Sequence, residues 1–118
     1  MPATTPATLN IRPQRRADYV LRLVLKDGDG VALNLAGYSI YASVWNKDRD
    51  IKYGDFVSTV ISAATGTVEL KMGYAITATL PLSTSGHAYY DVMLVDPSGN
   101  RTYVLEGLVR ASEGYTTP

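Results

Sequence analysis

The clearest alternation of apolar and polar positions runs from Tyr89 to Val109 and is interrupted once, by Asp96-Pro97-Ser98-Gly99-Asn100. A proline at the second position, an aspartate before it and a glycine that can adopt a positive φ are typical of a β-turn between paired strands. The pattern therefore predicts an antiparallel hairpin, with Tyr90, Val92 and Leu94 on one face of its first strand.

In the second strand of this hairpin, strict alternation places Tyr103 and Leu105 on one face. Further strand patterns recur at spacings of roughly 8 to 14 residues. They cover residues 9–12, 18–26, 31–35, 38–46, 56–61 and 67–72. Residues 47–55 are predicted to form a charged loop, and residues 75–80 a helical turn that ends at Pro81.

Short strands rich in Val, Tyr, Thr and Leu, without a long segment of helical periodicity, indicate an all-β protein. We expect an immunoglobulin-like antiparallel β-sandwich of about seven to eight strands. A small closed barrel is the alternative, because periodicity does not separate the two. Residues 1–8 contain only Met, Pro, Ala and Thr, so residues 1–12 are predicted to form an extended N-terminal arm. The β-sandwich domain then covers residues 13–111, and residues 112–118 form a C-terminal tail.

Composition narrows the function classes. The 118 residues suffice for one domain that buries about two thirds of its surface. Eleven basic and eleven acidic side chains cancel, which argues against nucleic acid as the main partner. The chain contains no cysteine, so disulfides and thiolate metal sites are excluded. We expect neither a secretory signal nor a membrane span, because no apolar run approaches the roughly 18 residues that cross a bilayer.

Candidate catalytic and metal-binding residues are few. Asp27 and Asp29 have the spacing of a calcium loop, but its later acidic positions are missing, so a plain turn is expected. His87 is the only histidine and has no recognisable nucleophile or acid beside it. We therefore expect a non-enzymatic protein without a cofactor or a metal ion. The acidic residues of the charged loop are Asp48, Asp50 and Asp55. We interpret them as solvated, and the alternatives are a divalent cation site or a docking surface.

Aromatic residues offer a stronger signal, since nine tyrosines and one tryptophan accompany a single phenylalanine. In the strand at 38–46, Tyr41 and Trp45 lie on the face opposite Ile40 and Val44. If Ile40 and Val44 point into the core, the two aromatics form an exposed stripe suited to a protein or a carbohydrate. Tyr53 is a further candidate for such a surface. The alternative is that Trp45 is the core tryptophan of the sandwich.

The one local excess of positive charge consists of Arg12, Arg15 and Arg16. These arginines are interpreted either as a solvated entry to a strand or as a docking site for an acidic neighbour.

The order of these elements resembles the N-terminal domain of phage baseplate upper proteins, which are β-sandwich proteins of tailed-phage virions. The resemblance covers about residues 18 to 111 of the 118. The segments that carry it are Leu23–Gly30, Leu35-Ala36-Gly37-Tyr38, Gly66-Thr67-Val68-Glu69-Leu70, Thr77-Ala78-Thr79-Leu80, Tyr90-Asp91-Val92, and Asp96-Pro97-Ser98-Gly99 with Leu105-Glu106-Gly107.

The resemblance implies a structural virion protein, made in the host cytoplasm, that acts in the tail, the baseplate or the fibre attachment. Its implied partners are other virion proteins and itself, as a trimer or hexamer. Capsid decoration and carbohydrate binding are the alternatives. Baseplate upper proteins continue into a long C-terminal region, whereas this sequence ends at Pro118, so we expect an adaptor rather than a host-recognition protein. Residues 1–12 are expected to add a strand to the edge of a neighbouring subunit.

Overall fold

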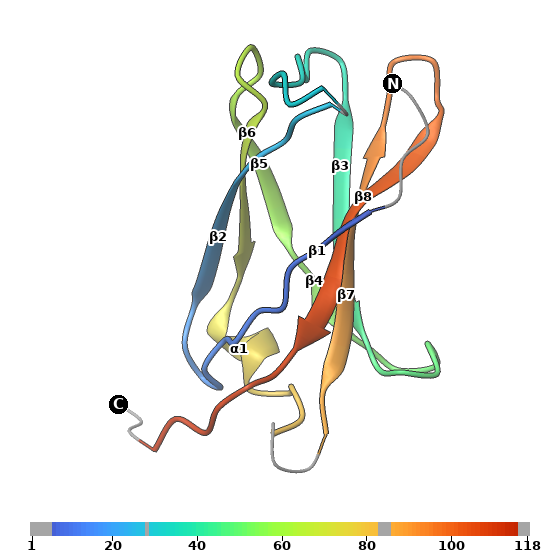
Figure 1. Ribbon diagram of the computed structural model, residues 1–118. Helices are drawn as coiled ribbons and strands as arrows, with labels where there is room; N and C mark the ends of the chain where they lie inside the picture. The colour runs from blue at the N-terminus through green and yellow to red at the C-terminus, as the bar shows by residue number, and fades with distance from the viewer. Residues whose placement is uncertain (1–5, 28, 83–85, 116–118) are drawn as a thin grey trace.

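The computed structural model describes residues 6–27, 29–82 and 86–115. Across these ranges the chain forms eight strands and one short helix, and the strands make two sheets that pack face to face (Figure 1). The predicted all-β class is confirmed. No strand pairing joins the two sheets into one, so the strands do not form a single closed barrel across the described ranges. The immunoglobulin-like topology stays a prediction.

Some residues of the predicted elements lie outside the described ranges. They are residues 1–5 of the predicted arm, Gly28 of the predicted turn, residues 83–85, and residues 116–118 of the predicted tail.

The larger sheet has the order β1-β8-β7-β3-β4, and its strand pairs are antiparallel except β1 with β8. Its strands are β1 (Ala7–Thr8), β3 (Ser39–Trp45), β4 (Lys52–Asp55), β7 (Ala88–Val95) and β8 (Arg101–Val109). β7 and β8 form the predicted hairpin. Asp96 Oδ1 accepts the backbone N–H groups of Ser98 and Asn100 at 2.9 Å each, which holds the turn closed.

The smaller sheet has the order β2-β6-β5 and is antiparallel throughout. Its strands are β2 (Tyr19–Val24), β5 (Val57–Ser62) and β6 (Thr67–Met72), and the helical turn α1 (Tyr74–Thr77) follows β6. Several local predictions are wrong. Residues 9–12 form no strand and contribute only the isolated bridge of Ile11 to Val109. Residues 31–35 contribute only an isolated bridge between Lys26 and Ala32, and residues 52–55 of the predicted loop form β4, because they pair with β3.

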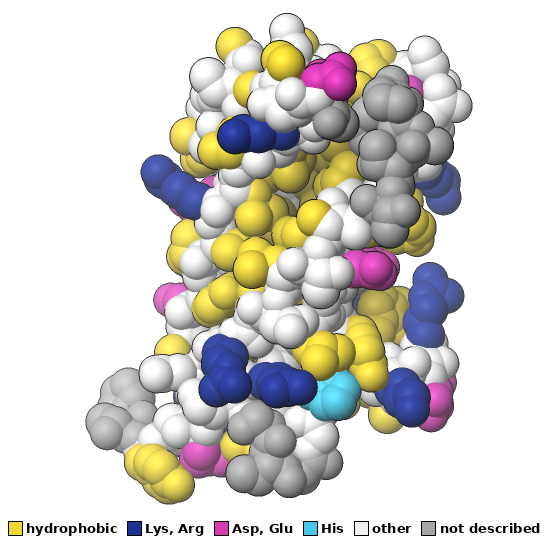
Figure 2. All heavy atoms as spheres, in the orientation of Figure 1, with side chains coloured by type: hydrophobic (Ala, Val, Ile, Leu, Met, Phe, Trp, Pro, Cys, Tyr) yellow, Lys and Arg dark blue, Asp and Glu magenta, His cyan; other side chains and the backbone are white. Residues whose placement is uncertain are grey.

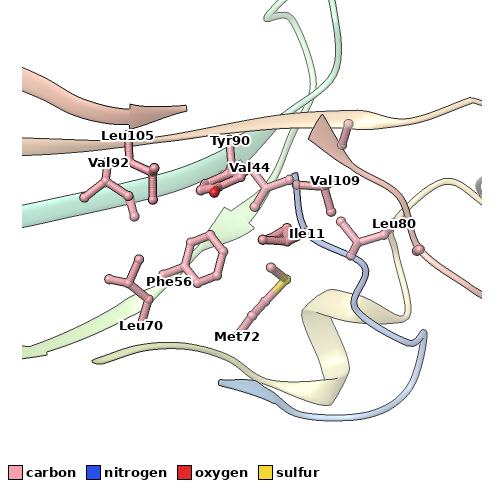
Figure 3. Close-up of a cluster of buried hydrophobic side chains, with 13 residues drawn as sticks. Ile11, Val44, Phe56, Leu70, Met72, Leu80, Tyr90, Val92, Leu105 and Val109 are labelled. Atoms are coloured by element: carbon pink, nitrogen blue, oxygen red, sulfur yellow. The ribbon is translucent and has the colours of Figure 1, made fainter. Parts of the chain in front are cut away.

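The core lies between the sheets and is built mainly from alternate residues of β3, β6, β7 and β8, together with Ile11, Phe56 and Leu80 from segments outside the strands (Figure 3). Val44, Tyr90 and Val92 point inward from the larger sheet and Leu70 and Met72 from the smaller one, each at most 3 % exposed. Burying one such side chain contributes about 1.5–3 kcal/mol. Packing of the two sheets is therefore the main source of stability in this fold.

A β-bulge in β8 decides which face two residues of the hairpin occupy. Val92 pairs with Leu105 and Met93 with Tyr103, so Val104 is inserted between the two pairs. Leu105 consequently points into the core, whereas Tyr103 points outward and is 49 % exposed. The prediction that Tyr103 and Leu105 share a face is wrong, since strict alternation does not hold across an inserted residue.

The N-terminal segment lies along β8 of its own chain. Residues 7–12 therefore do not extend away from the domain, contrary to the sequence prediction for the arm. β1 pairs with Leu105 and Glu106, and Ile11, which bridges to Val109, is buried in the core. The close approach requires Gly107, because a Cβ there would lie 2.0 Å from the carbonyl oxygen of Leu9. On this side of the molecule, apolar side chains reach the surface between the two sheets (Figure 2).

Candidate binding groove

The outer side of the larger sheet, the right-hand layer in Figure 1, carries a groove of about 580 Å³. This volume is within the range of small-ligand sites. Strands β3, β7 and β8 form its floor. The N-terminal segment contributes Thr8 and Asn10 at one end, and the loop between β3 and β4 contributes Asn46, Lys47 and Arg49 at the other. The groove is therefore bounded by two segments that lie far apart in the sequence, and the sequence pattern did not predict that they border the same groove.

Two rows of large side chains line this groove. Trp45 of β3 and Tyr89 of β7 are register partners in one row, and Tyr41, Met93 and Tyr103 follow one another across β3, β7 and β8 in the second. Tyr41 and Trp45 share the outer face of β3, as expected, but only Tyr41 is exposed, at 56 %, whereas Trp45 is partly buried. The alternative, a core tryptophan at position 45, is wrong because Ala42 and Val44 fill the core side of β3.

A polar belt separates the two rows. Strand register places Asp55, Ser43, Asp91, Glu106 and Thr8 side by side from β4 across to β1. At the β4 end, Ser43 Oγ donates to Asp55 Oδ1 at 2.5 Å, and Lys52 Nζ lies 2.7 Å from the same oxygen. The hydrogen bonds from Lys52 and Ser43 hold the pKa of Asp55 below its usual range.

Two carboxylates of this belt, Asp91 and Glu106, lie directly opposite each other on β7 and β8. Such partners have Cβ atoms about 5 Å apart, and like charges there repel. Burial, and secondly the charge of Glu106, raise the pKa of Asp91, whereas Arg49 acts in the opposite direction. Across the described ranges, neither carboxylate has a cationic group within 4.0 Å.

Two cations lie over Trp45, namely Arg49 from the loop between β3 and β4 and Lys52 from the start of β4. The guanidinium carbon of Arg49 lies 5.0 Å and Lys52 Nζ 5.8 Å from the ring centroid. Asn46 orders the loop, since its Oδ1 accepts the backbone N–H groups of Asp50 and Ile51. Arg49 adopts a positive φ of 59°, which costs a non-glycine residue about 1–2 kcal/mol. Residues 47–50 are exposed, as expected for a solvated loop, and hydrogen bonds to Asn46 shape its backbone.

The other predicted partner-binding residues lie outside the groove. Tyr53 packs against the core. Arg15 and Arg16 form ion pairs of 3.0 and 2.7 Å with Glu113, and hydrogen bonds and charge from both arginines hold the pKa of Glu113 below its usual range. Arg12 is exposed and does not line the groove. These arginines therefore do not form one surface with the aromatic rows, and Arg15 and Arg16 anchor the C-terminal segment.

The residues that the sequence suggested as catalytic or metal-binding candidates, His87, Asp27 and Asp29, make local contacts within their own segments. His87 Nε2 lies 3.1 Å from the hydroxyl of Tyr89, and their rings meet edge to face. Asp27 Oδ1 accepts the N–H groups of Asp29 and Val31, which shapes a turn. Within the part of the chain that the structure describes, no three His, Cys, Asp or Glu side chains cluster to hold a metal ion. No helix in that part is long and apolar enough to cross a membrane.

Sequence reasoning missed half of the groove. Tyr89, Asp91 and Met93 were visible as one face of the predicted hairpin, and Tyr41 and Trp45 as one face of another strand. What connects them is the pairing of β3 with β7, which joins distant parts of the chain. Strict alternation places Tyr103 and Glu106 on opposite faces of the second hairpin strand, and the bulge hid that they share one face.

Comparison with known proteins adds no family. No protein-family model matches the chain, and no curated protein matches it significantly. The chemistry of the groove is therefore the basis for a functional proposal.

Proposed function

We propose that this protein is a non-enzymatic structural component of a tailed-phage virion, in the tail, the baseplate or the fibre attachment. It binds a neighbouring virion protein in the groove of its larger sheet. The observation that carries this proposal is a set of large side chains on the outer side of a sheet whose inner side already forms the core. They are Tyr41, Trp45, Tyr89, Met93 and Tyr103.

The composition of the groove supports a protein partner. Tyr, Trp, Met and Arg are enriched in protein interfaces relative to the rest of the surface, and Tyr, Trp and Arg supply most of the strongest anchors. Trp45 and Arg49 contact each other in the free protein, which lowers the cost of ordering them when a partner binds. The resemblance of the strand and turn order to baseplate upper proteins supports the assignment to a phage particle.

The proposal is tested in particles of a phage that encodes this protein. We expect the double variant Tyr41→Ser and Tyr103→Ser to fold normally but to be depleted from purified particles, as measured by quantitative mass spectrometry. Tyr74→Ser is the matched control, because Tyr74 is 64 % exposed on α1 and does not line the groove. This control is expected to enter particles like the wild type.

Two results contradict the proposal. Normal incorporation of the double variant would exclude the groove as the interface, and absence of the wild-type protein from particles would exclude a virion component. The copy number per particle separates a tail position from capsid decoration, because a protein that covers the capsid is present in far more copies than one in the tail.

Carbohydrate binding is the second candidate function. It is favoured by the rings of Tyr41 and Tyr103, about half exposed beside the polar belt of the groove. Arg49 and Lys52 over the ring of Trp45 weaken this candidate, because they occupy an aromatic surface that a sugar would stack on. Glycan-array binding that is lost in Tyr103→Ser and kept in Tyr74→Ser would favour the carbohydrate.

A further inference from the structure

We propose that the groove recognises an arginine or lysine side chain on an extended segment of the partner protein, and that Asp91 and Glu106 bind its cationic group between the two aromatic rows. This inference rests on the proposed function and deepens it by stating the chemistry of the partner.

The first argument is the repulsion between the two carboxylates. Asp91 and Glu106 are direct cross-strand partners on the same side of the sheet, where like charges destabilise the pairing. A cation between them adds two attractions, which together outweigh the one repulsion. A neutral ligand such as a sugar leaves the repulsion in place, so the pair favours a positively charged ligand.

The second argument is that two of the three cations lining the groove, Lys52 and Arg49, have other contacts. Lys52 forms its ion pair with Asp55, and Arg49 lies over Trp45. Lys47 is exposed at the loop end of the groove. Burial and the charge of Glu106 raise the pKa of Asp91 although Arg49 acts to lower it, so the cations among the described residues offset the negative charge of the pair only in part.

The third argument is the aromatic surroundings. A cation gains stabilisation from the face of Trp or Tyr, and Trp45 already has Arg49 and Lys52 over its ring. Tyr89 and Tyr103 belong to the rows on either side of the carboxylate belt. A guanidinium or ammonium group at the pair therefore meets carboxylates and aromatic rings together.

The size of the groove favours a peptide segment over an isolated side chain. From β3 to β8 the groove crosses two strand spacings, which is about 10 Å, and its volume of about 580 Å³ exceeds that of one side chain. Residues beside the cationic one would then contact Tyr41 and Met93 in the second row.

The single tryptophan of the chain lines the groove, so its fluorescence reports on this site. The probe is a capped peptide of alternating serine and arginine, and its matched control carries citrulline, which keeps the shape of arginine without the charge. We expect the arginine peptide to shift the fluorescence of Trp45 with an affinity at least about tenfold higher than the citrulline peptide, since hydrogen bonds between charged groups are stronger than those of a neutral group.

The double variant Asp91→Asn and Glu106→Gln is expected to weaken binding of the arginine peptide by about tenfold or more. The control double variant, Asp29→Asn and Glu69→Gln, makes the same change in net charge at two positions that do not line the groove, and is expected to bind like the wild type. Circular dichroism checks that both variants keep the fold.

Equal affinity for the two peptides, or equal losses in the two double variants, would overturn the inference. So would a neutral oligosaccharide that shifts the fluorescence when the arginine peptide does not. The particle assay separates this failure from failure of the proposed function. If Asp91→Asn with Glu106→Gln enters particles normally while Tyr41→Ser with Tyr103→Ser does not, the groove is an interface without a cation site.

Discussion

Tyr90 shows how one polar atom can connect a core to a peripheral segment. Its ring is buried and meets Phe56 edge to face, with centroids 6.0 Å apart. Its hydroxyl donates to the carbonyl oxygen of Leu9 at 2.6 Å, so the N-terminal segment is held by a core residue of β7. Burial, with a smaller effect of Tyr19, raises the pKa of Tyr90 to about 12.

This pKa predicts a loss of stability in alkali. The unfolded chain releases the tyrosine proton near pH 10, and the folded chain near pH 12. Between these values the unfolded state binds fewer protons, so the free energy of unfolding falls as pH rises. Below about pH 10 the contribution is fully present.

Tyr90→Phe is expected to lower the free energy of unfolding by about 1 kcal/mol at neutral pH, through the lost hydrogen bond, and to reduce its decline in alkali. Part of the decline remains, because burial also raises the pKa of Tyr19. Urea unfolding at several pH values measures both effects. Tyr115→Phe, at an exposed position, is the control, and an unchanged alkaline decline in Tyr90→Phe would contradict the prediction.

At the scale of elements, the contact between β8 and the N-terminal segment depends on a missing side chain. A Cβ on Gly107 would lie 2.0 Å from the oxygen and 2.6 Å from the carbon of the Leu9 carbonyl group. These are backbone atoms, so the clash cannot be relieved by rotation of a side chain. The N-terminal segment would have to move away from β8.

Gly107→Ala is therefore expected to destabilise the protein by about 1–3 kcal/mol and to speed hydrogen exchange at the amides of Leu9 and Ile11, which donate to β8. Gly73→Ala is the matched control, because a Cβ at Gly73 has no atom within 4 Å. Equal exchange rates in Gly107→Ala and the wild type would show that the segment tolerates the displacement.

At the scale of the whole molecule, the N-terminal segment is part of the core. Deleting residues 1–12 removes Ile11, which is 3 % exposed, and the Leu9 carbonyl that Tyr90 binds. Loss of a buried isoleucine side chain costs about 2–5 kcal/mol, so we expect a large drop in the thermal unfolding temperature. Deleting residues 1–5 removes none of these contacts and is the control.

Thermal unfolding and light scattering on the same samples measure stability and oligomeric state together. A deletion of residues 1–12 that unfolds like the wild type would contradict the docked segment. A trimer or hexamer that is lost only in this deletion would support an additional role of the segment in assembly.

Structural features that depend only on residues adjacent in the sequence were determined by the sequence alone. Asp96, Pro97 and Gly99 specify the turn between β7 and β8, because their side chains and allowed φ angles act within the turn. Period-two alternation predicted the strands for the same reason, since it reflects the pleat of a single strand. The turn and the all-β class therefore needed no tertiary information.

Tertiary structure decided which face of each strand is inside and which strands meet. Alternation defines two faces of β3, but only packing against Leu70 and Met72 of the other sheet placed Val44 inside and Trp45 outside. The inserted Val104 and the opposition of Asp91 and Glu106 depend on the register of β7 and β8. The groove itself depends on contacts between residues far apart in the chain, and local patterns contain no information about those distances.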